Sequence, residues 1–158
     1  MHILLVDDHP LFRQAVREVI ESHFPSPVVR EASTGEDALR TVRAESVEVA
    51  ILDISLPDSS GLTVLRQIKQ VRPSLKCLVL TAYDNAQYVR LAIAHGASGY
   101  LTKGVTPGEL YEAIRTILSG RPVVMELFRD ALNDFSKRQG AARSDESLSA
   151  RELEVLSL

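Results

Sequence analysis

The chain of 158 residues is 45% hydrophobic and 25% charged, which suits one globular domain with a sizeable core and a shorter appendage. Its formal net charge of -3 and its isoelectric point near 5.8 exclude the strongly basic field of a self-sufficient nucleic-acid binder. One cysteine excludes an internal disulfide, and no apolar run approaches the roughly 18 residues that span a bilayer, so we expect a cytoplasmic protein without membrane contact.

Short apolar runs rich in Val, Ile and Leu alternate with segments of helical period along the chain. The predicted strands cover residues 3–6, 28–32, 47–52, 77–80 and 98–101. The predicted helices cover residues 10–23, 35–44, 61–71, 85–95 and 107–118. Most of these strands lack in/out alternation, which is typical of a parallel sheet buried on both faces. The alternation predicts a doubly wound α/β fold, and the local pattern leaves the strand order open.

The ends of the predicted helices carry their own signals. Pro10 and Pro107 suit the first turns of helices, and the pair His95 and Gly96 suits a C-terminal cap. The compact domain is expected to end near Gly120, so the first predicted domain covers residues 1–120.

Residues 121–147 are predicted to form a linker helix and a flexible tether. Helical character over residues 123–137 predicts the linker helix, and the small polar stretch QGAARSDES after it predicts the tether. The last stretch, LSARELEVLSL at residues 148–158, resumes helical periodicity, with Ser149 and Glu152 spaced as a capping box. Another helix is expected to begin there.

Polar side chains follow the predicted strands at one consistent place, their carboxyl ends. Asp7 and Asp8 follow the first strand, Asp53 ends the third, Thr81 follows the fourth and Lys103 follows the fifth. This edge of an open α/β sheet is where ligands bind. If the first and third strands are neighbours, three carboxylates converge, and a pair of them about 4 Å apart repels by about 4 kcal/mol at an effective dielectric near 20. We expect a cation there.

Mg²⁺ is the cation that suits this set of side chains. Carboxylates with room for several waters are its preferred protein ligands, and His9, beside the acids, is interpreted as a surface or capping residue. A carboxylate beside Mg²⁺ and a lysine can attack a phosphoryl group to form an acyl phosphate, which makes Asp53 the predicted nucleophile. Thr81 and Lys103 are predicted to contact the phosphoryl oxygens. Each acid alone could equally cap a turn, but such caps would not explain the whole set.

The chain resembles the CheY-like receiver domains of two-component response regulators from residue 1 to about residue 118. The matching motifs, in order, are VDDHPLFR, LDISLPDSSG, LTA and GASGYLTKG. The resemblance implies a flavodoxin-like (βα)5 fold and phosphorylation of Asp53 by a partner histidine kinase. It also implies that Mg²⁺ is bound by the side chains of Asp8 and Asp53 and by the backbone carbonyl of Ser55, with Asp7 holding it through water.

The same resemblance implies how phosphorylation is sensed. Lys103 matches the active-site lysine of the family and would bind the phosphoryl group together with Thr81. Thr81 and Tyr100 match the switch pair of the family, in which the hydroxyl group and the aromatic ring move on phosphorylation. By itself, Tyr100 could equally be a half-buried strand aromatic.

The final stretch, residues 148–158, resembles the start of the LuxR-type helix-turn-helix domain of the NarL/FixJ group. It is therefore interpreted as the beginning of a truncated DNA-binding domain. The resemblance implies control of transcription in the complete protein, a homodimer on phosphorylation, and DNA binding only through the missing C-terminal domain.

Other interpretations remain open. A haloacid-dehalogenase-like Mg²⁺-dependent phosphatase also uses an Asp nucleophile at a strand end, but it needs a second Asp two residues later, where this chain has Ser55. A nucleotide-binding fold would need a glycine-rich loop after the first strand. A pseudo-receiver that works only as an interaction module would not need the complete set of acids, Thr81 and Lys103. We therefore expect a phosphoacceptor signalling protein that catalyses only its own phosphotransfer and dephosphorylation.

Overall fold

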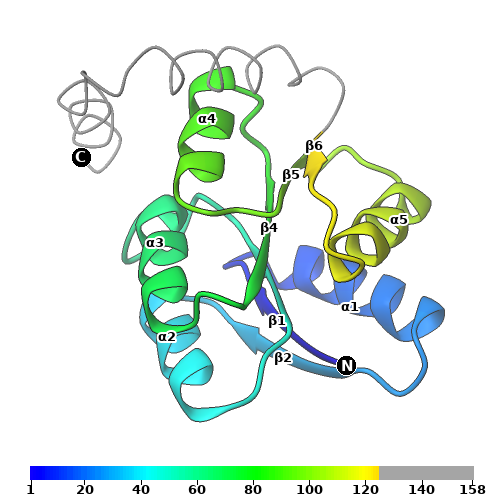
Figure 1. Cartoon of the computed structure of the whole chain (residues 1–158). Coiled ribbons are helices and arrows are strands. Elements are labelled where there is room, and N and C mark those ends of the chain that lie inside the picture. Colours follow the sequence, from blue (N-terminus) through cyan, green and yellow to red (C-terminus); the bar gives the residue numbers. More distant parts are fainter. Residues whose placement is uncertain (125–158) are drawn as a thin grey trace, which may run out of the picture.

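The computed structural model describes residues 1–124, which form one parallel sheet with helices on both faces (Figure 1). The strands are His2–Val6 (β1), Val28–Ala32 (β2), Val49–Leu52 (β3), Lys76–Thr81 (β4), Gly99–Thr102 (β5) and Val123–Val124 (β6). The helices are Pro10–His23 (α1), Gly35–Ala44 (α2), Gly61–Val71 (α3), Ala86–Ala94 (α4) and Pro107–Leu118 (α5). None of these helices is long and apolar enough to cross a membrane.

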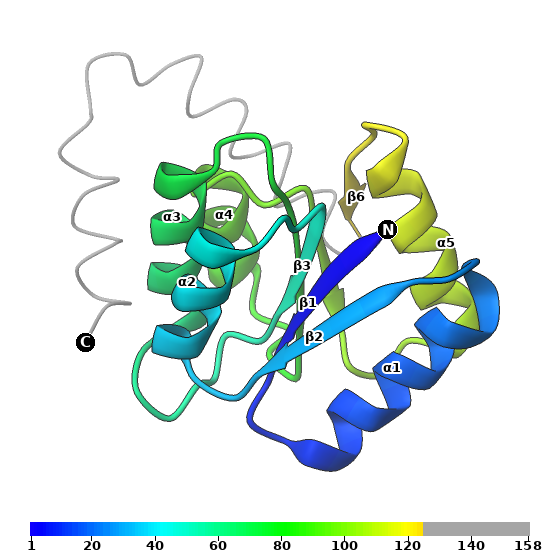
Figure 2. The same cartoon turned by 90° about the horizontal axis from the view of Figure 1, so that it is seen from below.

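The two faces of the sheet carry separate hydrophobic cores. Helices α1 and α5 cover one face, and α2, α3 and α4 cover the other (Figure 2). Successive residues of β1 point to opposite faces: Leu4 and Val6 belong to the core under α2 to α4, whereas Ile3 and Leu5 belong to the core under α1 and α5. This is why β1 is apolar at each position from Ile3 to Val6 instead of alternating.

The strand order is β2-β1-β3-β4-β5-β6, and all pairs are parallel. The first five strands have the order of the flavodoxin-like fold, which confirms the predicted fold class. From β1 the chain crosses to β2 on one side and later to β3 on the other. The carboxyl ends of β1 and β3 therefore open a crevice, at the point where such folds bind ligands.

The predicted helix ends are confirmed. Pro10 and Pro107 occupy the first positions of α1 and α5, where a missing backbone N–H removes no helical hydrogen bond. His95 caps the end of α4, and Gly96 follows with a φ of 97°, a left-handed conformation that glycine adopts without steric cost.

The structure differs from the prediction at the end of the described chain. Val123 and Val124, the first residues of the predicted linker helix, form β6 and pair with Gly99 and Tyr100 of β5. A Cβ atom at Gly99 would lie 2.6 Å from the Val123 carbonyl oxygen, so this approach requires glycine. Tertiary pairing thus overrides the local helical period at these two β-branched residues. The rest of the predicted linker, the tether and the final segment at 148–158 lie outside the described residues.

Candidate functional site

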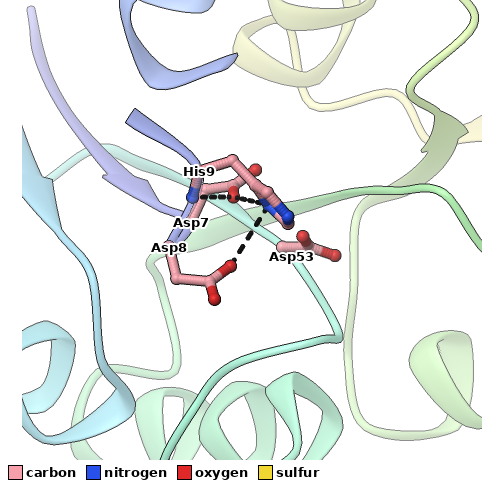
Figure 3. A group of neighbouring side chains, drawn as sticks. All are labelled: Asp7, Asp8, His9 and Asp53. Atoms are coloured by element: carbon pink, nitrogen blue, oxygen red, sulfur yellow. Dashed lines mark hydrogen bonds and ion pairs between the residues drawn. The ribbon is translucent and has the colours of Figure 1, made fainter. Parts of the chain in front are cut away.

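Three acidic side chains converge at the carboxyl ends of β1 and β3 (Figure 3). Because the two strands are neighbours, the Asp53 amide continues the ladder and donates to the Val6 carbonyl oxygen at 2.9 Å. One ligand atom from each of Asp7, Asp8, His9 and Asp53 lies within 4.8 Å of the others. Asp7 and Asp53 are 5% and 3% exposed, whereas Asp8 faces solvent. The convergence expected from neighbouring first and third strands is confirmed.

Lys103 provides the positive charge between the two buried acids. Its Nζ lies 2.8 Å from Oδ2 of Asp7 and 2.8 Å from Oδ2 of Asp53. Burial by itself lowers the pKa of Lys103, but the hydrogen bonds to Asp53 and Asp7 and their negative charges outweigh it, so the net pKa is raised. The ammonium group therefore stays charged and offsets the repulsion between the carboxylates.

Phe12, in the first turn of α1, covers Lys103 from the helix side. The Nζ of Lys103 lies 4.4 Å from the centroid of the Phe12 ring, a cation–π distance. Phe12 was not among the predicted site residues, because no local pattern relates a residue of the first helix to one that follows the fifth strand.

His9, interpreted from the sequence as a surface or capping residue, contacts two of the acids. It occupies the N-cap position of α1 and is exposed, as expected for a capping residue, but its side chain makes no capping hydrogen bond. Instead its Nδ1 lies 2.8 Å from Oδ1 of Asp7 and 3.2 Å from Oδ1 of Asp8. Its backbone N–H donates to the same Asp7 oxygen at 2.9 Å.

The loop that follows Asp53 is held against the strand by a glycine. The Gly61 N–H donates to the Ile54 carbonyl oxygen at 2.7 Å, and a Cβ atom at Gly61 would lie 2.0 Å from the Asp53 carbonyl oxygen. Only glycine allows this approach. Within the loop, the Ser55 N–H donates to Oδ1 of Asp53 at 3.3 Å, which helps to orient the carboxylate.

Asp58 anchors the other side of the same loop. Its carboxylate accepts hydrogen bonds from the backbone N–H groups of Gly35 and Glu36, at 2.9 and 3.1 Å, and so caps the N-terminus of α2. The bond from Gly35 is the main reason why the pKa of Asp58 is lowered. This long-range cap was not predicted, because Gly35 and Asp58 are distant in sequence.

Thr81 and Tyr100 both contact the backbone of Tyr83 in the loop after β4. The Thr81 hydroxyl oxygen accepts from the Tyr83 N–H at 3.5 Å, and the Tyr100 hydroxyl donates to the Tyr83 carbonyl oxygen at 2.7 Å. Both side chains are fully buried, and burial raises the pKa of Tyr100. The fold therefore joins the two predicted switch residues through one short loop.

The donor set of the acidic cluster fits a hard divalent cation. Its ligand atoms are mainly carboxylate oxygens, one buried pair faces the crevice, and Asp8 lies at the solvent edge. Hard cations such as Mg²⁺ are bound by one or two carboxylates and keep several waters, which an exposed edge allows. Cys77 takes no part: it is fully buried, and burial raises the pKa of its thiol to about 12.

The fold and the site together are those of a receiver domain of a two-component signalling protein. The family model for the response regulator receiver domain matches residues 3–115, so the chain belongs to the response regulator receiver family.

Two curated proteins and one solved structure show what the chain is similar to. Response regulator UvrY of Escherichia coli O6:H1 is 34% identical over 99% of this chain and 72% of its own length. The DNA-binding transcriptional activator DevR/DosR of Mycobacterium tuberculosis is 34% identical over 93% of this chain and 67% of its own. A solved LuxR-family two-component response regulator from Aurantimonas sp. SI85-9A1 has a TM-score of 0.77 and 33% identity, covering 84% of this chain and 95% of that one. The chain contains the receiver domain of a LuxR-family response regulator.

Proposed function

We propose that Asp53 is the phosphoacceptor and that a histidine kinase supplies the phosphoryl group. The position of Asp53 supports this role: its carboxylate is nearly buried at the end of β3 and lies 2.8 Å from the Lys103 ammonium. One Asp53 oxygen forms a bond to phosphorus while the bond from phosphorus to the donor's imidazole nitrogen breaks. The electron pair of that bond leaves with the nitrogen.

The same proposal includes Mg²⁺ as the cofactor. Asp8, Asp53 and the Ser55 carbonyl oxygen would hold it directly, and Asp7 would hold it through water. Bound there, it would neutralise negative charge on the transferring phosphoryl oxygens. The clustering of the acids within 4.8 Å and the exposure of Asp8 to solvent support this assignment.

Lys103 and Thr81 are proposed to bind the phosphoryl oxygens, and Thr81 and Tyr100 to transmit the change. Lys103 would exchange part of its contact with Asp53 for a phosphoryl oxygen, because both are anions at the same edge. Movement of the Thr81 hydroxyl toward the phosphoryl group would release or tighten the Tyr83 loop, which Tyr100 also contacts. In this proposal, the conformational change that begins at the phosphorylated edge of the sheet reaches Tyr100 of β5 through the loop that contains Tyr83.

The output of the complete regulator is proposed to be control of transcription. DevR/DosR, the relative at 34% identity, is itself a DNA-binding transcriptional activator. We propose that DNA binding belongs to a helix-turn-helix domain that begins near residue 148, and that phosphorylation favours a homodimer. The receiver would end near residue 120, with a linker over residues 121–147.

Phosphorylation in vitro tests the assignment of Asp53. The full chain is incubated with acetyl phosphate and Mg²⁺, and its intact mass is measured. We expect one added phosphoryl group in the wild type and none in Asp53→Asn. Asp37→Asn, an acid on the exposed face of α2 that pairs with Arg40, serves as the matched control and should be phosphorylated normally. Persistent labelling of Asp53→Asn would contradict the proposal.

A further inference from the structure

Arg13, in the second turn of α1, holds the backbone of Asp7. Its Nη1 donates to the Asp7 carbonyl oxygen, and its Nε donates to Oε1 of Glu31 on β2 at 3.1 Å. The Arg13 side chain is 18% exposed; its bond to the Asp7 carbonyl is partly buried, whereas its bond to Glu31 lies at the surface. One guanidinium group thus ties together α1, the end of β1 and β2.

Both the backbone and the side chain of Asp7 make hydrogen bonds or ion pairs, and the geometry of these contacts depends on the position of the Asp7 backbone. Its N–H donates to the Ala32 carbonyl oxygen at 3.0 Å, which is the last bond of the β1–β2 ladder. Its carboxylate meets Nζ of Lys103 at 2.8 Å and the N–H of His9 at 2.9 Å. The carbonyl of a residue that is 5% exposed needs a donor from the protein, and Arg13 supplies one.

We propose that Arg13 is a positioning residue for the metal site: by holding the Asp7 carbonyl it fixes the turn from which Asp7 and Asp8 present their carboxylates. This inference rests on the proposed Mg²⁺ site. Groups that hydrogen-bond to the residues of a metal site, without contacting the metal, contribute strongly to metal affinity, because a displaced carboxylate no longer meets the metal at the required distance and angle. The planar guanidinium suits this task, since its donors reach Glu31 and Asp7 in two directions at once.

Arg17, one turn further along α1, provides a matched control. It is also bound to Glu31, with Nη2 3.0 Å from Oε2, and it donates to the Val29 carbonyl oxygen at 3.1 Å. It therefore shares the helix, the charge and the acidic partner of Arg13, but its bonds go to Glu31, Glu21 and Val29 rather than to Asp7.

The sign of the effect separates positioning from simple electrostatics. Replacing either arginine by methionine removes one positive charge near an acidic site. Long-range electrostatics alone would therefore strengthen Mg²⁺ binding in both variants. Positioning predicts the opposite for Arg13 only: Arg13→Met should weaken Mg²⁺ binding by about 10-fold.

Isothermal titration calorimetry of the full chain with Mg²⁺ tests this prediction in the wild type, Arg13→Met, Arg13→Lys and Arg17→Met. Arg13→Lys keeps the positive charge but lacks the several N–H donors of the guanidinium group, so we expect this variant to bind Mg²⁺ more weakly than the wild type. A metal-free readout accompanies the titration: the amide proton resonance of His9, which is bonded to the Asp7 carboxylate, should shift in Arg13→Met and stay in place in Arg17→Met. Thermal unfolding of both methionine variants confirms that they fold.

The outcomes are distinct. Wild-type Mg²⁺ affinity in Arg13→Met with an unmoved His9 resonance would overturn the positioning role, as would equal weakening in Arg17→Met. Full recovery by Arg13→Lys would show that the guanidinium group is not required and would overturn the role proposed for its two-directional bonding. If the wild type itself binds no Mg²⁺, the metal site fails and the inference fails with it, which is distinguishable from loss confined to Arg13→Met.

Discussion

Asp53 and Lys103 lie 50 residues apart in sequence, yet Oδ2 of Asp53 and Nζ of Lys103 are 2.8 Å apart. Their strands, β3 and β5, are separated by β4 in the sheet. The Lys103 side chain spans the width of β4. Its backbone N–H donates to the Thr81 carbonyl oxygen at 2.8 Å, and this bond fixes the point from which the side chain leaves the sheet. The pair therefore depends on three parallel strands in the correct order.

Replacing Lys103 by methionine should destabilise the metal-free protein, because the buried Asp7 and Asp53 lose a half-buried cation. Bonds to charged groups contribute about 1.5–3 kcal/mol each, so the loss should be readily measured. Mg²⁺ should then raise the melting temperature of the variant more than that of the wild type, since it supplies the missing positive charge. Thermal unfolding with and without Mg²⁺ measures both effects.

Lys69→Met is the control for this experiment. The Nζ of Lys69 also makes two bonds, to the carbonyl oxygens of Pro73 and Leu75, but these bonds lie away from the acids. The Lys69→Met variant should lose stability, but Mg²⁺ should raise its melting temperature no more than that of the wild type. An equal response to Mg²⁺ in both variants would argue against a shared role of Lys103 and the cation.

Gly61→Ala should distort the end of β3. The added Cβ atom would lie 2.0 Å from the Asp53 carbonyl oxygen and 2.7 Å from Cα of Ile54, so the backbone must shift. Overpacking of this kind costs about 1–3 kcal/mol. Urea unfolding should show that loss, and phosphorylation by acetyl phosphate should slow because Asp53 moves.

Gly108→Ala, in the first turn of α5, is the matched substitution. Its nearest contact would be Oγ1 of Thr106 at 4.0 Å, so the methyl group fits without displacement. It should leave phosphorylation unchanged and stabilise the fold by about 0.4–1 kcal/mol through the unfolded state. Equal slowing of phosphorylation by both alanines would refute the steric explanation.

Tyr100→Phe should loosen the loop after β4. The change removes the buried hydroxyl that donates to the Tyr83 carbonyl oxygen at 2.7 Å, while the ring remains to fill its place. We expect a loss of about 1 kcal/mol in the free energy of unfolding. Hydrogen exchange should accelerate at residues 82–85 and stay unchanged in the loop between β1 and α1, and a uniform acceleration would contradict the local role.

His95 should make stability depend on pH. Burial, and next the charge of Arg66, lower its pKa below the ordinary value of 6.5. Below pH 6.5 the unfolded chain therefore takes up a proton that the folded chain does not, and stability falls as the pH drops toward the lowered pKa. His95→Asn should remove this part of the pH dependence in urea unfolding between about pH 7.5 and pH 5. Identical profiles for the two proteins would exclude His95 as the source.

Local patterns in the sequence were sufficient for β1 to β5, for the five helices and for the convergence of acidic side chains at one edge of the sheet. Helical and strand periods reflect how side chains meet a core, so five of the six described strands and all five described helices were predicted to within a few residues. Strand-end polar residues such as Asp53 were predicted to face one edge, because parallel strands end together. The order of motifs matched the receiver family, which the comparisons confirmed.

Only the tertiary structure decided what depends on contacts between distant segments. The order of strands, the distance from Asp53 to Lys103, and the bond from Arg13 to Asp7 join parts of the chain that no local pattern relates. At Val123 a contact between distant segments overrode the local pattern, which favoured a helix. The Val123 amide donates to the Ser98 carbonyl oxygen at 2.9 Å, and Gly99 beside it has no side chain that would block the strand. Propensity is worth a few tenths of a kcal/mol per residue, about the size of a single long-range hydrogen bond or less, so pairing prevails where the fold brings a partner.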